Sequence, residues 1–186
     1  RQPHGDVYIT VGKTVNDICQ TNFPILPHIV QLPDTEKDLR KDLGIPENAV
    51  VFGRYGGKDT FDISFVYEVI QHILVHGPSH IYFLFMNTNK FLQISNERII
   101  YLPSTTDLIK KREFINTCDA LLHARSQGET FGLTCGEFSI CNKPVITWDG
   151  SREREHLNIL QKDAILYSNP MDLFEILTSF TKTKYD

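Results

Sequence analysis

Two glutamates in a Glu-x7-Glu spacing, Glu129 and Glu137, are the residues whose types and spacing most clearly indicate chemistry in this chain. Glu129 lies in a predicted tight turn that leads into Phe131. The residues after Phe131 predict a helix that begins at a glycine and carries Glu137 about two turns further on. We therefore expect both carboxylates to face one crevice.

The start of that predicted helix is a candidate anion site. The first N–H groups of a helix have no partner within it and carry partial positive charge, so they attract a phosphate. Glycines at positions 132 and 136 would let a ligand approach the backbone closely. Carboxylates beside such a site are useful if they bind a neutral group attached to the phosphate, such as sugar or ribose hydroxyls. The pattern predicts a nucleotide-sugar site, which would also include Phe131, Gly132, Leu133 and Thr134.

A second segment places two cations after a predicted buried strand. The strand Val50–Arg54 is followed by a glycine-rich turn that contains Lys58, and a helix is predicted from Thr60. Arginine offers a planar fork of donors and lysine a mobile point charge, a combination that suits a diphosphate. Gly53 belongs to the same candidate site.

The segment from Gly128 to Glu137 resembles the donor-binding motif of the retaining GT-B glycosyltransferases of the group 1, or family 4, type, which have two Rossmann-like lobes. The resemblance implies that Glu129 contacts the donor sugar and that Glu137 holds the ribose hydroxyls. It also implies that Arg54 and Lys58 bind the diphosphate, although their spacing is one residue shorter than is usual in the family. The implied activity is sugar transfer, with retention, from a UDP-, GDP- or ADP-sugar.

Other positions follow from the same resemblance. Asn87, Tyr101 and Leu102 come after predicted strands, where members of the family contact the nucleotide. Arg125 lies just before Glu129 and could add charge against the phosphate. The neighbouring His123 is more typical of a packed structural histidine. None of these residues indicates which base is bound.

Several alternative functions find less support in the residues. A glycoside hydrolase also uses two carboxylates but has no use for a diphosphate clamp. Gly12-Lys13-Thr14 lacks the upstream glycine of a P-loop, and Gly53, Gly56 and Gly57 lack the spacing of a dinucleotide-binding fingerprint. A non-catalytic nucleotide-binding or interaction module with the same fold stays open.

Metal chemistry is not expected. His72 and His76 lie four apart on a predicted helix, but no third ligand is nearby in sequence, so a solvated helix end is favoured. The chain contains no Asp-x-Asp sequence that could hold a metal-bound diphosphate. We therefore expect no metal and no cofactor, with the nucleotide-sugar as substrate.

Apolar runs alternate with amphipathic runs along the chain, which predicts an α/β fold, a Rossmann-like parallel sheet with helices on both faces. Because ligands bind such sheets at the carboxyl ends of the strands, both motifs should meet at one edge. The predicted strands are Val7–Val11, Val50–Arg54, His80–Met86, Arg98–Leu102, Ala120–Ala124, Pro144–Trp148 and Ala164–Tyr167. The predicted helices are Glu36–Leu43, Thr60–His76, Asp107–Thr117, Phe131–Cys141, Arg152–Leu160 and Pro170–Phe180.

Two regions differ in character. Residues 44–186 carry all the motifs and are predicted to form the nucleotide-sugar-binding domain, the C-terminal lobe of a GT-B enzyme. Residues 1–43 are rich in proline and resemble the connection that leads out of an N-terminal lobe. We expect this chain to lack that lobe, which would hold the acceptor, a glycan, lipid or protein, and we expect the isolated lobe to be weak or inactive in transfer.

Length and composition are those of one ordinary domain. The 186 residues can bury a sizeable core, and the net charge of −4 gives no support to a nucleic-acid partner. No apolar run approaches the roughly 20 residues of a membrane-spanning helix, and no signal peptide is recognisable. We expect a soluble, cytoplasmic protein with reduced cysteines.

Overall fold

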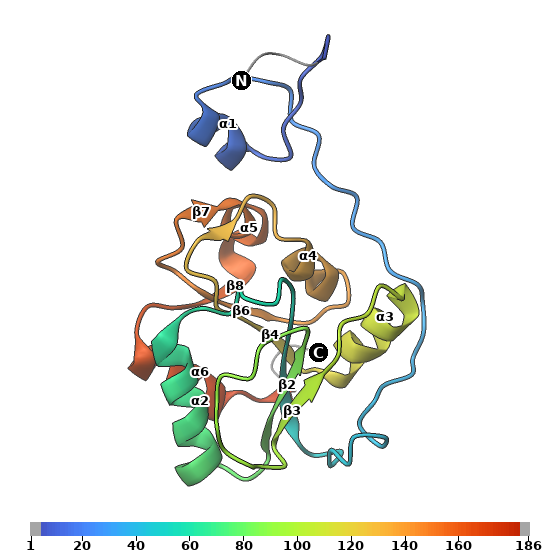
Figure 1. The fold of residues 1–186 in the computed structure, drawn as a ribbon, viewed down its shortest axis with the longest axis vertical. Helices are drawn as coiled ribbons and strands as arrows, with labels where there is room; N and C mark the ends of the chain where they lie inside the picture. The colour runs from blue at the N-terminus through green and yellow to red at the C-terminus, as the bar shows by residue number, and fades with distance from the viewer. Residues whose placement is uncertain (1–4, 183–186) are drawn as a thin grey trace.

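The computed structural model describes residues 5–182 and has a six-stranded parallel sheet at its centre, in the order β3-β2-β1-β4-β6-β8 (Figure 1). The chain adds β2 and β3 on one side of β1, then returns and adds β4, β6 and β8 on the other. The order therefore reverses between β1 and β4, where open α/β sheets bind ligands. The strands are β1 (Val50–Tyr55), β2 (Ile81–Met86), β3 (Ile99–Leu102), β4 (Ala120–His123), β6 (Val145–Trp148) and β8 (Ala164–Tyr167).

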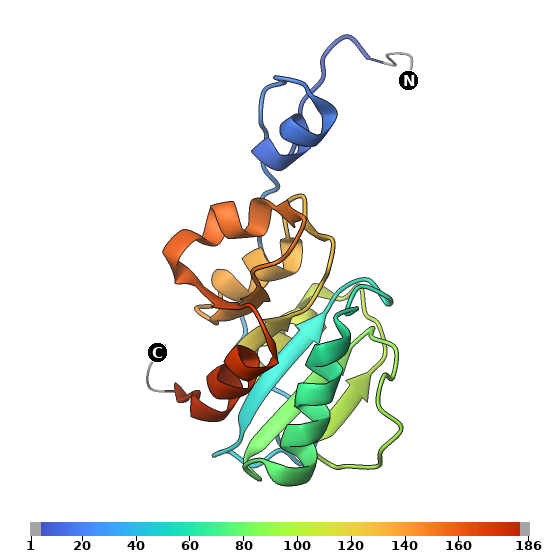
Figure 2. The same ribbon diagram turned by 90° about the vertical axis from the view of Figure 1, so that its left-hand side faces the viewer.

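Helices cover both faces of this sheet. The helices α2 (Ser64–His76) and α6 (Pro170–Ser179) lie together on one face, as Figure 2 shows. The opposite face is covered by α3 (Leu108–Thr117) and α4 (Leu133–Ser139). A small parallel ribbon of β5 (Gly128–Glu129) and β7 (Glu153–Arg154) leads into α5 (Glu155–Leu160) and the 3-10 turn η1 (Gln161–Asp163). These layers confirm the predicted Rossmann-like fold class.

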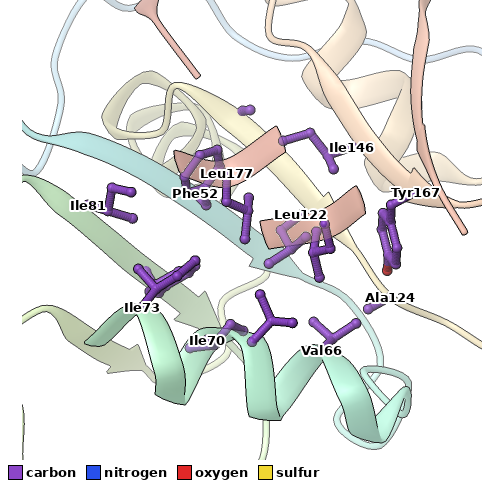
Figure 3. Close-up of a cluster of buried hydrophobic side chains, with 14 of the residues drawn as sticks. Phe52, Val66, Ile70, Ile73, Ile81, Leu122, Ala124, Ile146, Tyr167 and Leu177 are labelled. Carbon is purple, nitrogen blue, oxygen red and sulfur yellow. The ribbon is translucent and has the colours of Figure 1, made fainter. Parts of the chain in front are cut away.

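Side chains along the buried strands point alternately to the two faces of the sheet, so the core consists of two clusters, one on each face. Phe52 of β1 packs on the α2 side with Ile70 and Leu122, as Figure 3 shows. Val51, the preceding residue, points to the other face and joins Phe114 of α3. Every residue of β1 is buried, as expected for a central strand with helices above and below it.

Most predicted elements are confirmed with ends shifted by a few residues. The six strands from residue 50 onwards and the helices over 107–117, 131–141, 152–160 and 170–180 are all present. The helix predicted from Thr60 begins only at Ser64. The residues before it are held by other contacts: Thr60 donates its hydroxyl to the Gly57 carbonyl, and Asp62 donates its amide to the Ala124 carbonyl.

Two predictions in the N-terminal region are wrong. Residues Val7–Val11 form no strand, and only a single bridge joins Thr10 to Ile25. An unpredicted helix, α1 (Lys13–Cys19), follows instead.

The predicted helix Glu36–Leu43 is a series of bends and turns. Backbone groups in and just before this segment form hydrogen bonds with the end of α3 instead. The Leu39 amide donates to Thr117 Oγ1, and the carbonyls of Thr35 and Lys37 accept from the Asn116 side chain.

The N-terminal segment runs along the outside of the domain. In Figure 1, α1 lies beyond α5, and the chain then passes α3 on its way to β1. The carboxylate of Glu155 accepts hydrogen bonds from the amide and hydroxyl of Thr14. Further along, Arg40 forms an ion pair of 2.8 Å with Asp119, which also accepts from the Val51 amide. The segment is thus attached to the domain at both ends.

Two sequence expectations concern cysteines and membranes. All four cysteines are free thiols, and burial raises the pKa of Cys118 and Cys135 above the usual range. Within residues 5–182, every helix is too short or too polar to cross a membrane.

Gly53 is required by packing inside β1. A Cβ atom at this position would lie 2.1 Å from Cys118 Sγ, in a part of the core that is closed on both faces. Gly53→Ala is therefore expected to lower the free energy of unfolding by about 1–3 kcal/mol, measured by urea denaturation. Combining it with Cys118→Ala, which removes the sulfur atom, should recover part of the loss. A Gly53→Ala variant as stable as the wild type would contradict this packing argument.

Candidate functional site

A cavity of about 380 Å³ lies where the sheet order reverses, beyond the carboxyl ends of β1 and β4. Three stretches of chain meet there: the loop after β1, the loop after β4, and the turn from β5 into α4. One residue of the N-terminal segment completes the wall. The lining residues are His28, Arg54, Tyr55, Gly56, Gly57, Thr60, His123, Arg125, Glu129, Thr130, Phe131, Gly132, Leu133 and Thr134.

Glu129 is held on both carboxylate oxygens. Oε2 accepts a hydrogen bond of 2.9 Å from Arg125 Nη1, and Oε1 lies 3.2 Å from His123 Nε2. Burial alone would raise the pKa of Glu129, but the contacts with His123 and Arg125 outweigh it and lower the pKa below its usual value. The cavity thus contains an ionised carboxylate of fixed orientation, with lone pairs left for a ligand.

The turn into α4 is built around a glycine. Gly132 is the N-cap of α4 with φ of 93°, a left-handed conformation that favours glycine. A Cβ atom there would also lie 2.9 Å from His156 Cβ. Phe131, Leu133 and Thr134, which flank this glycine, line the cavity.

Arg54 lies in the cavity wall, but its guanidinium is already hydrogen-bonded within the protein. Nη2 donates to the Gly57 carbonyl and to Thr60 Oγ1, each at 2.7 Å. Nη1 donates to Thr88 Oγ1 at 2.5 Å and to the Asn87 carbonyl at 3.4 Å. Arg54 is only 4% exposed, and burial lowers its pKa to about 10. The side chain therefore braces the loop after β1 and keeps a positive charge beneath the cavity.

Glu137 does not reach this cavity. It is buried in α4, where it accepts a hydrogen bond from the Tyr55 hydroxyl and lies 3.5 Å from Lys111 Nζ of α3. Burial and the adjacent carboxylate raise the pKa of Tyr55 beyond the usual range, so its hydroxyl stays a donor. The two glutamates therefore occupy neighbouring but separate places, although the sequence predicted a single crevice.

Lys58 and Gly53 also lie outside the cavity wall. The Lys58 side chain is exposed, and the backbone carbonyl of Lys58 accepts a hydrogen bond from the Asn89 amide at 3.3 Å. Gly53 is buried inside β1 against Cys118. Of the four predicted phosphate-side residues, the structure brings Arg54 and Arg125 together at the cavity and leaves Lys58 and Gly53 apart.

The three predicted nucleotide contacts occupy different surroundings. Asn87, in a left-handed conformation, donates to the Gly56 carbonyl at 2.8 Å and so supports the loop after β1. Tyr101 stacks on Phe85 with ring centroids 5.4 Å apart, and burial raises its pKa to about 12. Leu102 lines a smaller groove of about 240 Å³ with Met86, Pro103, Ser104, Thr105, Lys110, Glu113 and Leu39.

This second groove lies near Glu137. Lys110 lines the groove, and the next residue on α3, Lys111, contacts the Glu137 carboxylate. Tyr55, the other partner of Glu137, lines the cavity, so Glu137 has contacts with residues beside both the cavity and the groove.

The sequence interpretation missed His28 and a row of buried polar side chains behind Glu129. The His28 ring contacts Phe131 edge-on, with centroids 5.0 Å apart, and comes from a proline-rich segment with no recognisable motif. Thr147 and His156 lie in separate elements and meet His123 only in the folded chain. No spacing in the sequence signals either contact.

Metal ligands were not expected from the sequence. Across residues 5–182, no group of three or more His, Cys, Asp or Glu side chains is placed to hold a metal ion. The rings of His72 and His76 lie 5.1 Å apart on α2, and His72 also contacts Phe174 of α6.

Neither a protein-family model nor a curated protein sequence matches the chain, whereas solved structures do. WaaG, a glycosyltransferase involved in lipopolysaccharide biosynthesis, matches with a TM-score of 0.69 and 16% identity over 91% of this chain and 52% of its own. HepE from Anabaena, solved in complex with UDP-glucose, matches with a TM-score of 0.67 and 15% identity over 93% of this chain and 53% of its own. TarM matches with a TM-score of 0.66 and 14% identity over 95% of this chain and 36% of its own.

The chain therefore spans about half the length, or less, of the structures it matches. TM-scores of 0.66–0.69 establish a shared fold, and at such low identity the likeness concerns the fold alone. Together with the sheet order and the helices on both faces, they show that the chain has the Rossmann-like α/β fold of one lobe of the GT-B glycosyltransferases.

Proposed function

We propose that this chain is the donor-binding lobe of a retaining glycosyltransferase, which binds a nucleoside-diphosphate sugar and passes the sugar to an acceptor held by a second lobe. The observation that carries the proposal is the cavity at the reversal of strand order, lined by Arg54, Arg125 and the ionised Glu129. Cations suit the phosphates and a fixed carboxylate suits sugar hydroxyls. HepE, which shares the fold, was solved with UDP-glucose.

The donor would extend along the carboxyl edge of the sheet. Its sugar and diphosphate would occupy the cavity, with Glu129 accepting hydrogen bonds from the sugar. The ribose would bind Glu137, whose carboxylate has acceptor capacity beyond Tyr55 and Lys111. The base of the UDP-, GDP- or ADP-sugar would enter the groove beside Leu102.

The chemical step requires stabilisation of the charge that grows on the departing diphosphate. Arg54 and Arg125 would supply positive charge, and the first N–H groups of α4 would supply donors, all fixed before the reaction starts. Lys58 would add a mobile charge from the exposed loop after β1. We propose transfer without a metal and with the acceptor, a glycan, lipid or protein, bound mainly by another lobe.

A second candidate is a non-catalytic nucleotide-binding or interaction module with the same fold. It is favoured by one observation: both terminal nitrogens of Arg54 already donate to protein acceptors, and Lys58 lies outside the cavity. In this module Arg54 would only brace the loop. Substitution of Arg54 and Lys58 separates the two candidates, because the first predicts a loss of donor affinity and the second only a change in stability.

Calorimetric titration with UDP, GDP, ADP and their glucose or mannose conjugates tests the proposal. We expect one nucleotide to bind selectively. Glu137→Gln should weaken its binding at least about tenfold, because a charged acceptor for the ribose hydroxyls is lost. Glutamine keeps the shape of the side chain and an oxygen that can accept from the Tyr55 hydroxyl, while the ion pair with Lys111 is lost.

Glu68→Gln is the matched control, since Glu68 is exposed on α2 and lies away from the cavity lining. It should leave nucleotide affinity unchanged. Binding of no nucleotide by the wild-type chain, or equal affinity of wild type and Glu137→Gln, would contradict the proposed donor site.

A further inference from the structure

A row of four side chains runs from the interior of the domain to the cavity. His156 Nε2 of α5 lies 3.2 Å from Thr147 Oγ1 of β6, and Thr147 Oγ1 lies 2.9 Å from His123 Nδ1 of β4. His123 Nε2 then lies 3.2 Å from Glu129 Oε1. His123 and Thr147 are direct partners in the β4–β6 register, so the sheet itself fixes their contact.

Burial makes this row a rigid support. Thr147 is fully buried and His156 is 1% exposed. The His123 and His156 rings lie 4.9 Å apart, and His156 Cβ packs against Gly132 at the start of α4. These side chains therefore have little freedom to turn, and each must satisfy its hydrogen bonds within the row.

One arrangement of protons satisfies the row. The ionised Glu129 can only accept, so His123 Nε2 carries the proton that it donates. His123 Nδ1 is then free to accept from the Thr147 hydroxyl, whose oxygen accepts in turn from His156 Nε2. His156 Nδ1 keeps only a lone pair, and this atom is buried without a hydrogen-bond partner among the described residues.

The reverse arrangement is less favourable. Thr147 would donate to His156 Nε2, which would place the single His156 proton on Nδ1, where an N–H would be buried without an acceptor. Burial, followed by repulsion from His123, lowers the pKa of His156 to about 3, so the ring carries one proton at neutral pH. A buried donor without an acceptor costs about 1–3 kcal/mol.

We propose that Thr147 and His156 are positioning residues that hold His123 in its Nε2–H tautomer and thereby fix the carboxylate of Glu129 for the sugar of the donor. The effect on ligand binding rests on the proposed function, in which Glu129 contacts the sugar. Arg125 restrains Oε2 and the histidine row restrains Oε1. Both oxygens are then preorganised before the ligand arrives.

The experiment uses this chain labelled with ¹⁵N-histidine and compares Thr147→Val, Thr147→Ser and a control, Thr117→Val. Thr117 is also fully buried and hydrogen-bonded, to the Glu113 carbonyl and the Leu39 amide, but lies at the end of α3. It reports the cost of losing a buried hydroxyl elsewhere. Imidazole ¹⁵N shifts at neutral pH give the tautomer, with His123 assigned by the signal lost in His123→Gln.

We expect the Nε2–H tautomer of His123 in the wild type, Thr147→Ser and Thr117→Val, and a mixture of tautomers in Thr147→Val. Calorimetry with UDP-glucose, GDP-mannose and ADP-glucose should show the bound conjugate weakened about tenfold by Thr147→Val, with the free nucleoside diphosphate unaffected. Thr147→Ser should restore the affinity.

A wild-type His123 protonated on Nδ1 only, or a Thr147→Val variant with unchanged tautomer and unchanged conjugate affinity, would overturn the inference. Failure of the wild-type chain to bind any of these ligands would instead overturn the proposed function, and the tautomer measurement would still decide whether the histidine row exists.

Discussion

Arg54→Ala is expected to lower the free energy of unfolding by about 3 kcal/mol and to abolish binding of the nucleoside diphosphate. The substitution removes a buried guanidinium, which leaves the Asn87 carbonyl without its donor and takes away the charged donor of the Gly57 carbonyl. Hydrogen bonds to charged groups contribute about 1.5–3 kcal/mol each, and the loop after β1 can relax only partly. Urea denaturation measures the first effect and calorimetric titration with UDP, GDP and ADP the second.

Arg54→Lys is the informative control. Lysine keeps the positive charge, but its single ammonium group cannot donate to the acceptors of both loops as the planar guanidinium does. We expect intermediate stability and weakened nucleotide affinity. A lysine variant that is destabilised yet binds nucleotide as the wild type does would assign Arg54 to loop bracing alone, and an alanine variant of wild-type stability would contradict the bracing itself.

The stability of the protein is expected to fall as the pH is lowered from about 6.5, because His156 stays neutral in the folded chain. Burial, reinforced by His123, lowers its pKa from 6.5 to about 3. Between these values the unfolded chain binds a proton that the folded chain does not. The free energy of unfolding should therefore decrease with falling pH by up to about 1.4 kcal/mol per unit, and this contribution is fully present above pH 6.5.

Urea denaturation at a series of pH values between 7.5 and 5 measures this slope. The range stays above the usual pKa of 4.5 for Glu129, whose lowered pKa would add a loss of stability only at more acidic pH. His156→Gln should remove from the slope nearly the whole contribution of one proton. His76→Gln, which replaces an exposed histidine on α2, should leave the slope unchanged. Equal slopes in all three proteins would contradict the assignment to His156.

The fold could be predicted from the sequence because its signals are local. The run Val50–Phe52 is apolar and begins the central strand β1, which is followed by a glycine-rich turn. Asp107 and Asn169 begin helices at the expected places because their side chains accept from the first free amides. The N-terminal region was mispredicted because tertiary contacts such as that of Leu39 with Thr117 replace local hydrogen bonds.

The site was predicted in part. Glu129 and Arg54 were expected at one edge of the sheet, since Arg54 ends one predicted strand and Glu129 follows another, and both line the cavity. Glu137 was expected in the same crevice, but its helix directs it towards Tyr55 and Lys111. Helical spacing gives the distance along the axis between two residues, while the surface that each side chain faces depends on how the helix packs.

Local patterns were enough to predict the sheet, its helices and the edge at which the motifs lie, because strand alternation, helix caps and the left-handed Gly132 act over a few residues. Which donors and acceptors meet depends on long-range packing. The partners of Arg54 come from two loops, and the row from His156 through Thr147 to His123 joins residues of separate elements. Such contacts depend on packing distances between segments, which no local pattern encodes.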